Sequence, residues 1–318
     1  MSKYRIFYFF IFLCFADLRG NPDFSIAASG TLLSFYSQNV EPGHFLVNPY
    51  FLLTNNYGFY NKNWSLKNKK NLYEVELLLF LQAGLTEFAD ITLALDGIYS
   101  RTGGVDSLQL SDTQVYLGFQ FLRDKPNTNT PDFRVLVGES FPTGKHDNLD
   151  ENKLLADGVG SGSYETAFGF ALQKRFFITE KNPLFVNLSF LYFLPTNASI
   201  EGFSIFGGGL GTEGTVSAGD YYFLNLGIEY RLNDDWSVAL DTRFDHGNSS
   251  KFSGDEGLDN ERLINEFILP SSEQFSIAPS FEFHPTENFT IASCVWVSVA
   301  GRNADAFVSL VASIAYYF

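Results

Sequence analysis

The end of the chain alternates strictly between two sets of residues. From Ala306 to Phe318, every second residue is Ala, Val, Leu, Ile, Tyr or Phe, and the chain finishes on Tyr-Tyr-Phe. A period of two is that of a β-strand, whose side chains point alternately to its two faces. Strands of outer-membrane barrels place aromatic residues at the membrane interfaces. We therefore predict a membrane-spanning strand here, with Tyr316 and Phe318 as the signal that the barrel assembly machinery recognises.

The other end of the chain predicts export. Lys3 and Arg5 precede an unbroken apolar run over residues 6–16, and the small residues Ala16 and Gly20 are candidate cleavage points. This pattern is that of a Sec-type signal peptide, assigned to residues 1–20, and the run is too short to span a membrane as a helix. The mature chain then retains only Cys294, which excludes an internal disulfide.

Composition supports a chain that shows alternate residues to lipid. Aromatic residues make up 17% of the sequence, the mean hydropathy is −0.01, and no second long apolar stretch follows the leader. The formal net charge of −15 argues against nucleic acid as a partner.

Period-two alternation bounded by turn residues recurs along the chain. It predicts about twelve segments of roughly ten residues, the length that a tilted strand needs to cross the hydrocarbon core. These segments are 45–54, 71–84, 90–100, 112–123, 131–141, 162–176, 183–194, 219–232, 235–246, 273–284, 288–300 and 305–318.

The connections between these segments alternate in length. Counted back from the last strand, every second connection is short, and most of the others are long: 55–70, 101–111, 142–161, 195–218 and 247–272. Bacterial barrels have short periplasmic turns and longer extracellular loops, whereas a soluble β-sandwich predicts no such asymmetry. We predict an all-β fold over residues 45–318, a transmembrane antiparallel β-barrel of about twelve strands in the bacterial outer membrane, with both termini periplasmic.

Residues 21–44 precede the first predicted strand. Their apolar residues suit a short helix that ends before Glu41-Pro42-Gly43. Two interpretations remain open, a periplasmic leader and a plug inside the lumen.

Alternation also predicts which charged side chains face the lumen. There they are tolerated only if they are hydrated or paired, so they either create a transverse field across a pore or fill a narrow barrel with salt bridges. The predicted lumen-lining residues are Glu74, Glu76, Asp96, Arg134, Glu165, Arg175, Glu229, Arg231, Asp241, Arg243, Asp245 and Glu282.

Enzyme chemistry finds little support. Of the four histidines, His284 is assigned to a periplasmic turn, His44 precedes the first strand, and His146 and His246 lie on the extracellular side. The glycine pattern of residues 209–214 lacks the strand-to-helix context of a dinucleotide site. We predict no catalytic residue, no metal site and no cofactor.

Three stretches carry a resemblance to a known family. They are Glu41-Pro42-Gly43-His44-Phe45 together with Asn48-Pro49-Tyr50, then Ser140-Phe141-Pro142-Thr143-Gly144, and Gly158-Val159-Gly160-Ser161-Gly162-Ser163-Tyr164-Glu165. With these, the chain resembles the outer-membrane barrel family named for the meta-pathway of phenol degradation. The resemblance implies a transporter or channel, with uptake of aromatic compounds in some members, and no catalytic residues.

The residues and the resemblance together predict a passive outer-membrane channel for small solutes, including hydrophobic or aromatic compounds. The alternative is a closed structural or surface-interaction barrel, an adhesin or envelope organiser that acts through its extracellular loops. Expected partners are outer-membrane lipid, lipopolysaccharide, the barrel assembly machinery and a small solute. Two interpretations remain open for the lysine cluster Lys67, Lys69 and Lys70 and for the acidic loop 247–272: contact with lipopolysaccharide, and charge that only keeps the loops hydrated.

Overall fold

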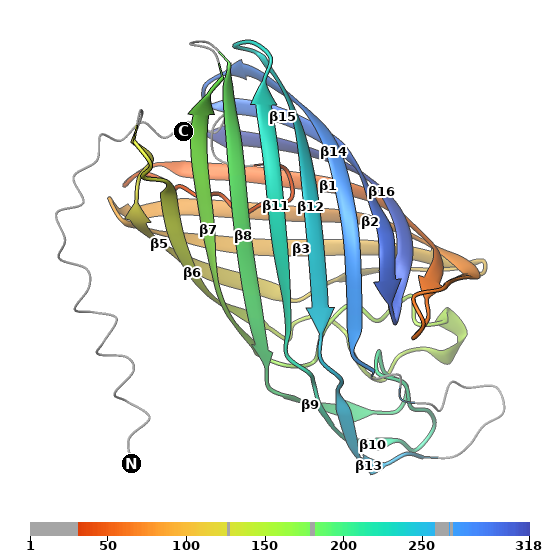
Figure 1. Ribbon diagram of the computed structural model, residues 1–318. Coiled ribbons are helices and arrows are strands. Elements are labelled where there is room, and N and C mark those ends of the chain that lie inside the picture. The colour runs from red at the N-terminus through yellow and green to blue at the C-terminus, as the bar shows by residue number, and fades with distance from the viewer. Residues whose placement is uncertain (1–30, 126–127, 179–181, 258–266, 268–269) are drawn as a thin grey trace, which may run out of the picture.

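The computed structural model describes residues 31–125, 128–178, 182–257, 267 and 270–318; the predicted signal peptide lies outside this part of the chain. Within it, twelve antiparallel strands close into a barrel, because β2 and β3 pair with each other as well as with β1 and β5 (Figure 1). The barrel strands are β1 (Phe45–Tyr60), β2 (Leu66–Thr86), β3 (Ala89–Thr102), β5 (Thr113–Leu122), β6 (Asp132–Phe141), β7 (Glu165–Phe177), β8 (Pro183–Pro195), β11 (Tyr221–Arg231), β12 (Trp236–Gly247), β14 (Ser272–Thr286), β15 (Phe289–Arg302) and β16 (Ala304–Tyr317).

The predicted twelve-strand barrel is therefore confirmed, and side-chain burial follows the predicted alternation. On β12, Val238 and Leu240 on the outer face are 38% and 42% exposed, whereas Asp241, the next residue on the inner face, is fully buried. Leu, Ile, Val and Phe side chains are exposed in the same way on the outer face of the other strands. Such an apolar outer wall is stable in lipid and not in water. The protein is an outer-membrane barrel.

The two ends of the barrel differ. At one end, the short-turn end, strands join through 87–88, 123–131, 178–182, 232–235 and 287–288. Phe318 lies at this end, where its backbone N–H donates to the carbonyl oxygen of Phe45 at 3.0 Å and its own carbonyl accepts from Phe45 at 2.8 Å. The opposite end carries the longer connections and is called the long-loop end. In the described residues, no helix is long and apolar enough to cross a membrane.

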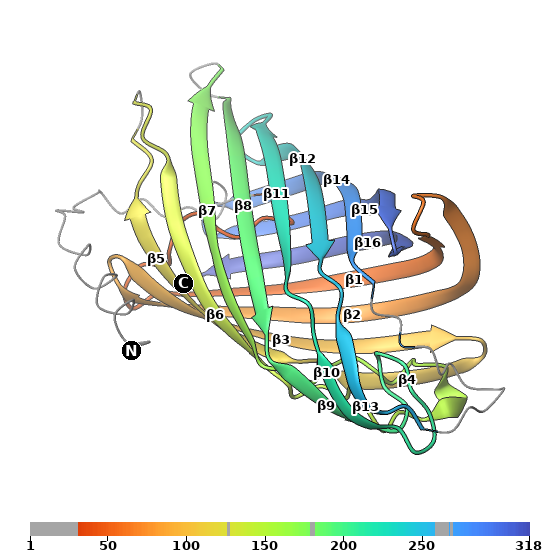
Figure 2. The same ribbon diagram turned by 60° about the horizontal axis from the view of Figure 1, so that its bottom comes forward.

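Four short strands at the long-loop end are absent from the predicted set. β4 (Val105–Leu110) extends the hairpin of β3, while β9 (Asn197–Glu201), β10 (Glu213–Ser217) and β13 (Lys251–Asp255) form a separate three-stranded sheet. Figure 2 shows this sheet beyond the ends of β8, β11 and β12. These strands have five or six residues and mostly polar sequences, which gave no alternation to detect. One 3₁₀ turn, Glu151–Lys153, lies nearby.

The first predicted long loop is also shorter than expected. β1 continues to Tyr60 and β2 starts at Leu66, so Lys67, Lys69 and Lys70 lie on a strand and not in a loop. Lys69 forms an ion pair with Asp305 on β16, with 2.6 Å between Nζ and Oδ1. The prediction failed because the polar sequence of this hairpin extension resembles a loop.

Asp112 lies in the short connection between β4 and β5 and binds the glycine-rich loop between β6 and β7. Its Oδ1 accepts from the backbone N–H of Gly144 at 2.8 Å, and its Oδ2 accepts from the N–H and the hydroxyl of Ser161, both at 2.7 Å. Glycine is required at the crossing, since a Cβ on Gly160 would lie 2.3 Å from the Gly144 carbonyl oxygen. The connection between β6 and β7 is thus a compact loop in which the backbones of Gly144 and Gly160 are in close contact.

The apolar core lies inside the barrel, around the segment that precedes β1. We call residues 31–44 the luminal segment. Leu32, Phe35 and Val40 each belong to, or pack against, a different one of three buried apolar clusters on the inner wall. In Figure 1 the start of the described chain, coloured red, runs through the barrel interior. Apolar burial against these clusters therefore favours the position of the segment in the lumen.

Candidate functional site

The luminal segment is held by buried polar side chains of the inner wall. At its start, Asp241 on β12 accepts a hydrogen bond from the hydroxyl of Thr31. The same carboxylate accepts from the backbone N–H of Leu33 at 3.3 Å, from the hydroxyl of Ser34 at 3.4 Å and from Nδ2 of Asn225 at 2.7 Å. A buried carboxylate needs such donors, so the segment supplies part of the solvation that Asp241 lost on burial.

A buried ion pair holds the other end. Arg134 on β6 and Asp90 on β3 lie 2.5 Å apart, with both side chains almost fully buried. The guanidinium also donates to the carbonyl oxygen of Tyr36 at 3.0 Å, and Asp90 accepts from the backbone N–H of Val40 at 2.9 Å and from Gln82 at 2.6 Å. The pair therefore binds backbone groups of the segment on both sides.

Amide and carboxylate groups of the wall fix the residues between these two points. Gln120 accepts from the backbone N–H of Asn39 at 2.8 Å and donates to the carbonyl oxygen of Ser37 at 3.1 Å. Gln38 donates to Asp132 at 2.9 Å. The segment has no regular secondary structure in residues 31–40, so these wall groups replace the hydrogen bonds that a helix or sheet would supply.

A cavity of about 350 Å³ adjoins the luminal segment. Its volume is within the range of small-molecule sites, and most of its lining is aliphatic or aromatic with a few polar groups, the usual composition of such sites. The lining residues are Leu32, Leu33, Ser34, Phe35, Tyr36, Asn48, Tyr50, Leu52, Glu76, Leu78, Phe80, Gln82, Thr92, Tyr116, Arg134, Leu136, Phe223, Arg243, Trp296 and Val311.

Of the two arginines that line this cavity, Arg243 contacts aromatic rings. Its guanidinium carbon lies 3.9 Å from the ring centre of Phe223 and 5.7 Å from that of Trp296. The guanidinium also donates to the carboxylate of Asp245 at 2.7–3.2 Å. Cation–π contact and the ion pair hold the guanidinium in place, so the cavity presents a fixed positive charge beside apolar surface.

The other predicted lumen residues lie at several depths. Glu76 lines the cavity, Glu74 accepts from Asn56 at 2.6 Å, and Asp96 is half-buried on the neighbouring strand. Glu165 accepts from the hydroxyl of Tyr221 at 2.6 Å. Arg175 lies near the short-turn end, with its Nε 3.7 Å from Asp124.

A second buried group lies on β11 and β14, on either side of β12. Glu229 and Glu282, both predicted to face the lumen, lie together with His284, and each offers a ligand atom within 4.8 Å of the others. Arg231 is close enough to act electrostatically on all three. The assignment of His284 to a turn is wrong, because β14 extends to Thr286 and the imidazole is buried. Continuing the alternation from Ser280 and Glu282 predicts this position.

Sequence reasoning missed several groups that position the luminal segment. Asp90 and Asp132 lie near the start of β3 and β6, within the predicted strands, but the predicted lumen-lining set does not include them. The aromatic lining was also missed, since Tyr116 and Phe223 face inward among polar neighbours. An inward-facing aromatic residue is indistinguishable by composition from one that faces lipid, so only the strand register identifies it.

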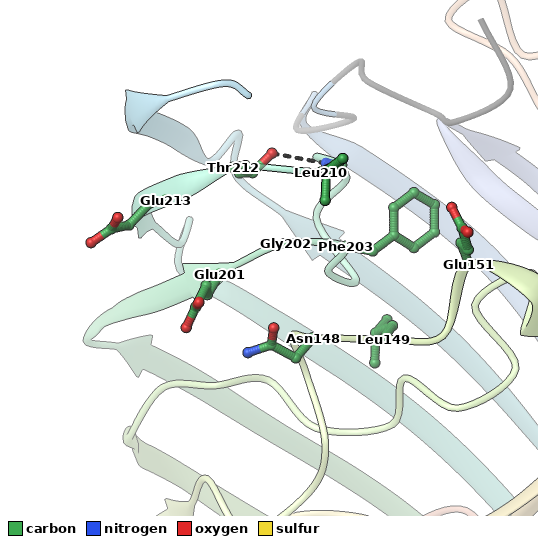
Figure 3. A pocket seen from close by; sticks show the side chains of 11 residues that line it. Asn148, Leu149, Glu151, Glu201, Gly202, Phe203, Leu210, Thr212 and Glu213 are labelled. Atoms are coloured by element: carbon green, nitrogen blue, oxygen red, sulfur yellow. Dashed lines mark hydrogen bonds between the residues drawn. The ribbon is translucent and has the colours of Figure 1, made fainter. Parts of the chain in front are cut away.

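A separate hollow of about 470 Å³ lies among the connections at the long-loop end, shown in Figure 3. It contains the glycine pattern of residues 209–214, and Glu213 starts a strand, so the context of a dinucleotide site is absent from this described region. Glu201 and Glu213 extend from neighbouring strands, and Glu151 lies across the hollow from them (Figure 3). The hollow is lined by Asn148, Leu149, Glu151, Glu201, Gly202, Phe203, Gly209, Leu210, Gly211, Thr212 and Glu213.

Known proteins resemble this chain in three-dimensional structure but not in sequence. No model of a protein family matches the chain, and no curated protein matches it. The crystal structure of an outer membrane channel from Pseudomonas putida F1 is similar with a TM-score of 0.66 and 12% identity, covering 89% of this chain and 98% of that chain.

Two further solved structures are more distant. The transport unit of the autotransporter AIDA-I from Escherichia coli gives a TM-score of 0.47 at 9% identity, covering 87% of this chain and 91% of that chain. The CymD monoaromatic hydrocarbon channel gives 0.38 at 11% identity, covering 88% of each chain. The likeness to the Pseudomonas channel establishes the fold, an outer-membrane β-barrel, and the two distant structures add nothing to it.

Proposed function

We propose that the protein is a passive outer-membrane channel for small apolar or aromatic solutes, and that the luminal segment is its plug. The observation that carries the proposal is the aromatic-lined cavity of about 350 Å³ next to that segment. A pore for hydrophilic solutes is lined by hydrated charge, whereas here Phe35, Tyr116, Phe223 and Trp296 line the space. The similar fold of the Pseudomonas channel and the resemblance to the meta-pathway family both support this assignment.

The charged lumen residues favour neither a broad transverse field nor a completely filled barrel. Arg134 with Asp90 and Arg243 with Asp245 are paired, and Asp241 is saturated by donors of the segment and of Asn225. We infer that this polar network anchors the plug and that the apolar lining beside it receives the solute. Release of the plug then requires breaking hydrogen bonds at Asp241, Gln120 and Asp90, which sets the barrier to opening.

The proposal also divides the chain into three parts. We assign residues 1–20 to a signal peptide, residues 21–44 to the plug and residues 45–318 to the barrel. The short-turn end then faces the periplasm, and solute reaches the cavity from the long-loop end. Lipopolysaccharide and the barrel assembly machinery are proposed partners, the latter through Tyr316 and Phe318.

A reversible cross-link tests the plug. A Cβ on Gly227 would lie 2.1 Å from Oγ1 and 2.8 Å from Cγ2 of Thr31, closer than two unbonded side chains allow. The two positions therefore touch, and cysteines there reach the spacing of a disulfide once the segment moves slightly away from the wall. The variant Thr31→Cys/Gly227→Cys is made in a Cys294→Ala background and reconstituted into liposomes. We expect entry of benzenesulfonate, an aromatic anion that crosses lipid too slowly by itself to obscure the channel, to be at least tenfold slower in the oxidised form than in the reduced form. The two single-cysteine variants are matched controls, because neither can form the bond.

The solute class is tested in the same liposomes. The proposal expects benzenesulfonate to enter faster than arabinose, a polar solute without an aromatic ring. Equal rates in oxidised and reduced forms would show that the luminal segment is not a plug. Faster entry of arabinose would replace the apolar channel by a hydrophilic one, and entry of neither solute in any form would overturn the channel.

The alternative of a surface-interaction barrel rests on one observation. The long-loop end has its own three-stranded sheet and the hollow of Figure 3, so its connections are folded and present a defined surface. If no variant admits solute, binding of intact cells to surfaces is compared between the wild type and a chain whose residues 202–212 are replaced by a short glycine-serine linker. Loss of adhesion in that chain alone would support this alternative.

A further inference from the structure

The group formed by Glu229, Glu282 and His284 has the composition of a metal site. Glu229 lies on β11 and the other two on β14, with β12 between them, and their side chains are only 1%, 4% and 3% exposed. One nitrogen or oxygen atom from each lies within 4.8 Å of the other two. Glu229 lies two strands away from Glu282 and His284, and the register of β11, β12 and β14 brings the three residues together.

The histidine is oriented from outside this group. Its Nδ1 lies 2.9 Å from the hydroxyl of Thr290 on β15, and its Nε2 lies 3.0 Å from the hydroxyl of Ser237 and 3.8 Å from Oε2 of Glu282. When Nδ1–H donates to Thr290, the Nε2 lone pair is directed toward Ser237 and Glu282. Metal-binding histidines are commonly fixed by such a hydrogen bond on the nitrogen that does not bind the metal.

Two carboxylate oxygens in this buried group have no hydrogen-bond partner. They are Oε1 of Glu229 and Oε1 of Glu282. Within the described residues, Arg231 is the guanidinium that acts on both carboxylates, and Asp241 adds a further negative charge nearby. One guanidinium does not neutralise two carboxylates, and an unneutralised carboxylate away from water is costly.

We propose that Glu229, Glu282 and His284 bind a divalent transition metal of the zinc class. An imidazole nitrogen with two carboxylate oxygens suits zinc, whereas calcium and magnesium favour oxygen ligands alone. The metal supplies the missing positive charge and occupies the two unpartnered oxygens. It also ties β11 to β14 across β12, beside the wall that holds the luminal segment.

The test is zinc binding by the purified, folded mature barrel after treatment with a chelator. We expect about one zinc per chain to remain after gel filtration, and the melting temperature to rise with zinc concentration, since a ligand that binds only the folded state stabilises it. X-ray absorption of the zinc-loaded barrel is expected to show one imidazole nitrogen among oxygen ligands.

Variants separate this group from adventitious binding. His284→Asn and Glu282→Gln are expected to weaken zinc binding at least tenfold. The matched control is His246→Asn, which removes a second histidine close to a glutamate, with 3.7 Å between His246 and Glu273 near the long-loop end, and is expected to change nothing. Heat-modifiable gel mobility checks that each variant is folded, and a His284→Gln variant replaces His284→Asn if that one is not.

Three results would overturn the proposal. The first is zinc binding by the wild type no stronger than by folded His284→Asn. The second is loss of binding in His246→Asn in place of His284→Asn. The third is a wild type without bound zinc together with a higher melting temperature for Glu282→Gln, which would show that a proton neutralises the carboxylates.

Discussion

At the scale of single residues, the buried ion pair between Asp90 and Arg134 has an unusual position. Both side chains are nearly inaccessible, and each also binds a backbone group of the luminal segment. A buried pair contributes little compared with apolar residues of equal size, but loss of one partner leaves the other charged and unsolvated. The pair therefore defines where the segment lies more than it stabilises the barrel.

Replacement of Asp90 by alanine is expected to destabilise the folded barrel by about 3–5 kcal/mol, because Arg134 is left buried without its partner. Urea unfolding in detergent micelles measures the change. The same charge is removed in Asp106→Ala, an exposed position on β4, which should be nearly neutral. A loss below about 1 kcal/mol for Asp90→Ala would mean that water or another anion reaches Arg134.

At the scale of elements, the sequence predicted the barrel strands closely because each has one face in lipid. Along β8, Phe185, Leu191 and Phe193 face inward, yet Asn187 and Ser189 between them preserve a period of two. β9, β10 and β13 lie beyond the lipid, so neither face is constrained to be apolar and no period appears. The boundaries of β1 and β2 were misplaced for the same reason.

The site was predicted less completely than the wall. Alternation placed charged residues such as Asp241 on the inner face, but it carries no information on which of them meet across the lumen. Whether the luminal segment is a leader or a plug was also undecided by sequence. The contacts of Thr31, Tyr36 and Val40 with wall residues far away in sequence place the segment inside the barrel. They depend on the closure of the barrel, so the sequence alone did not predict them.

The loop between β6 and β7 is expected to loosen on acidification. Burial alone would raise the pKa of the Asp157 carboxyl, but the ion pair with Lys145 at 2.7 Å and a hydrogen bond from the Asp150 N–H lower it overall. A lowered folded-state pKa gives stability that is present above the unfolded value, about 3.9, and is lost as the pH falls through the folded value.

Hydrogen exchange followed by mass spectrometry measures this effect, after correction for the pH dependence of the intrinsic rate. Peptides from residues 145–158 should lose protection at acidic pH, while peptides of the barrel strands keep theirs. Asp157→Asn should lower protection already near neutral pH and remove part of the acid dependence. An unchanged acid profile in this variant would show that Asp157 is not the group responsible.

At the scale of the whole molecule, the barrel closes at the pairing of β1 with β16, which joins the two ends of the barrel sequence. Phe318 completes this seam with two backbone hydrogen bonds to Phe45. Its ring also stacks on the rings of Phe45 and Tyr316, with centres 5.8 and 5.6 Å away. Phe318 thus combines two roles, closure of the sheet and the predicted recognition by the assembly machinery. Truncation of its side chain separates the two.

Phe318→Ala keeps both backbone hydrogen bonds and removes only the ring, whereas deletion of Phe318 removes both. We expect deletion to cost about 2–3 kcal/mol of barrel stability, from two hydrogen bonds and the aromatic contacts, and Phe318→Ala about 1 kcal/mol. Refolding of the purified chain into detergent, read by heat-modifiable gel mobility, should therefore be nearly normal for Phe318→Ala. The amount of this variant in the outer membrane of cells should nevertheless fall severalfold if the assembly machinery recognises the ring, as proposed. Equal reductions in cells and in detergent would instead mean that the ring acts only in closing the seam. Leu310→Ala is the control for loss of lipid contact, because it truncates an exposed residue of the same strand.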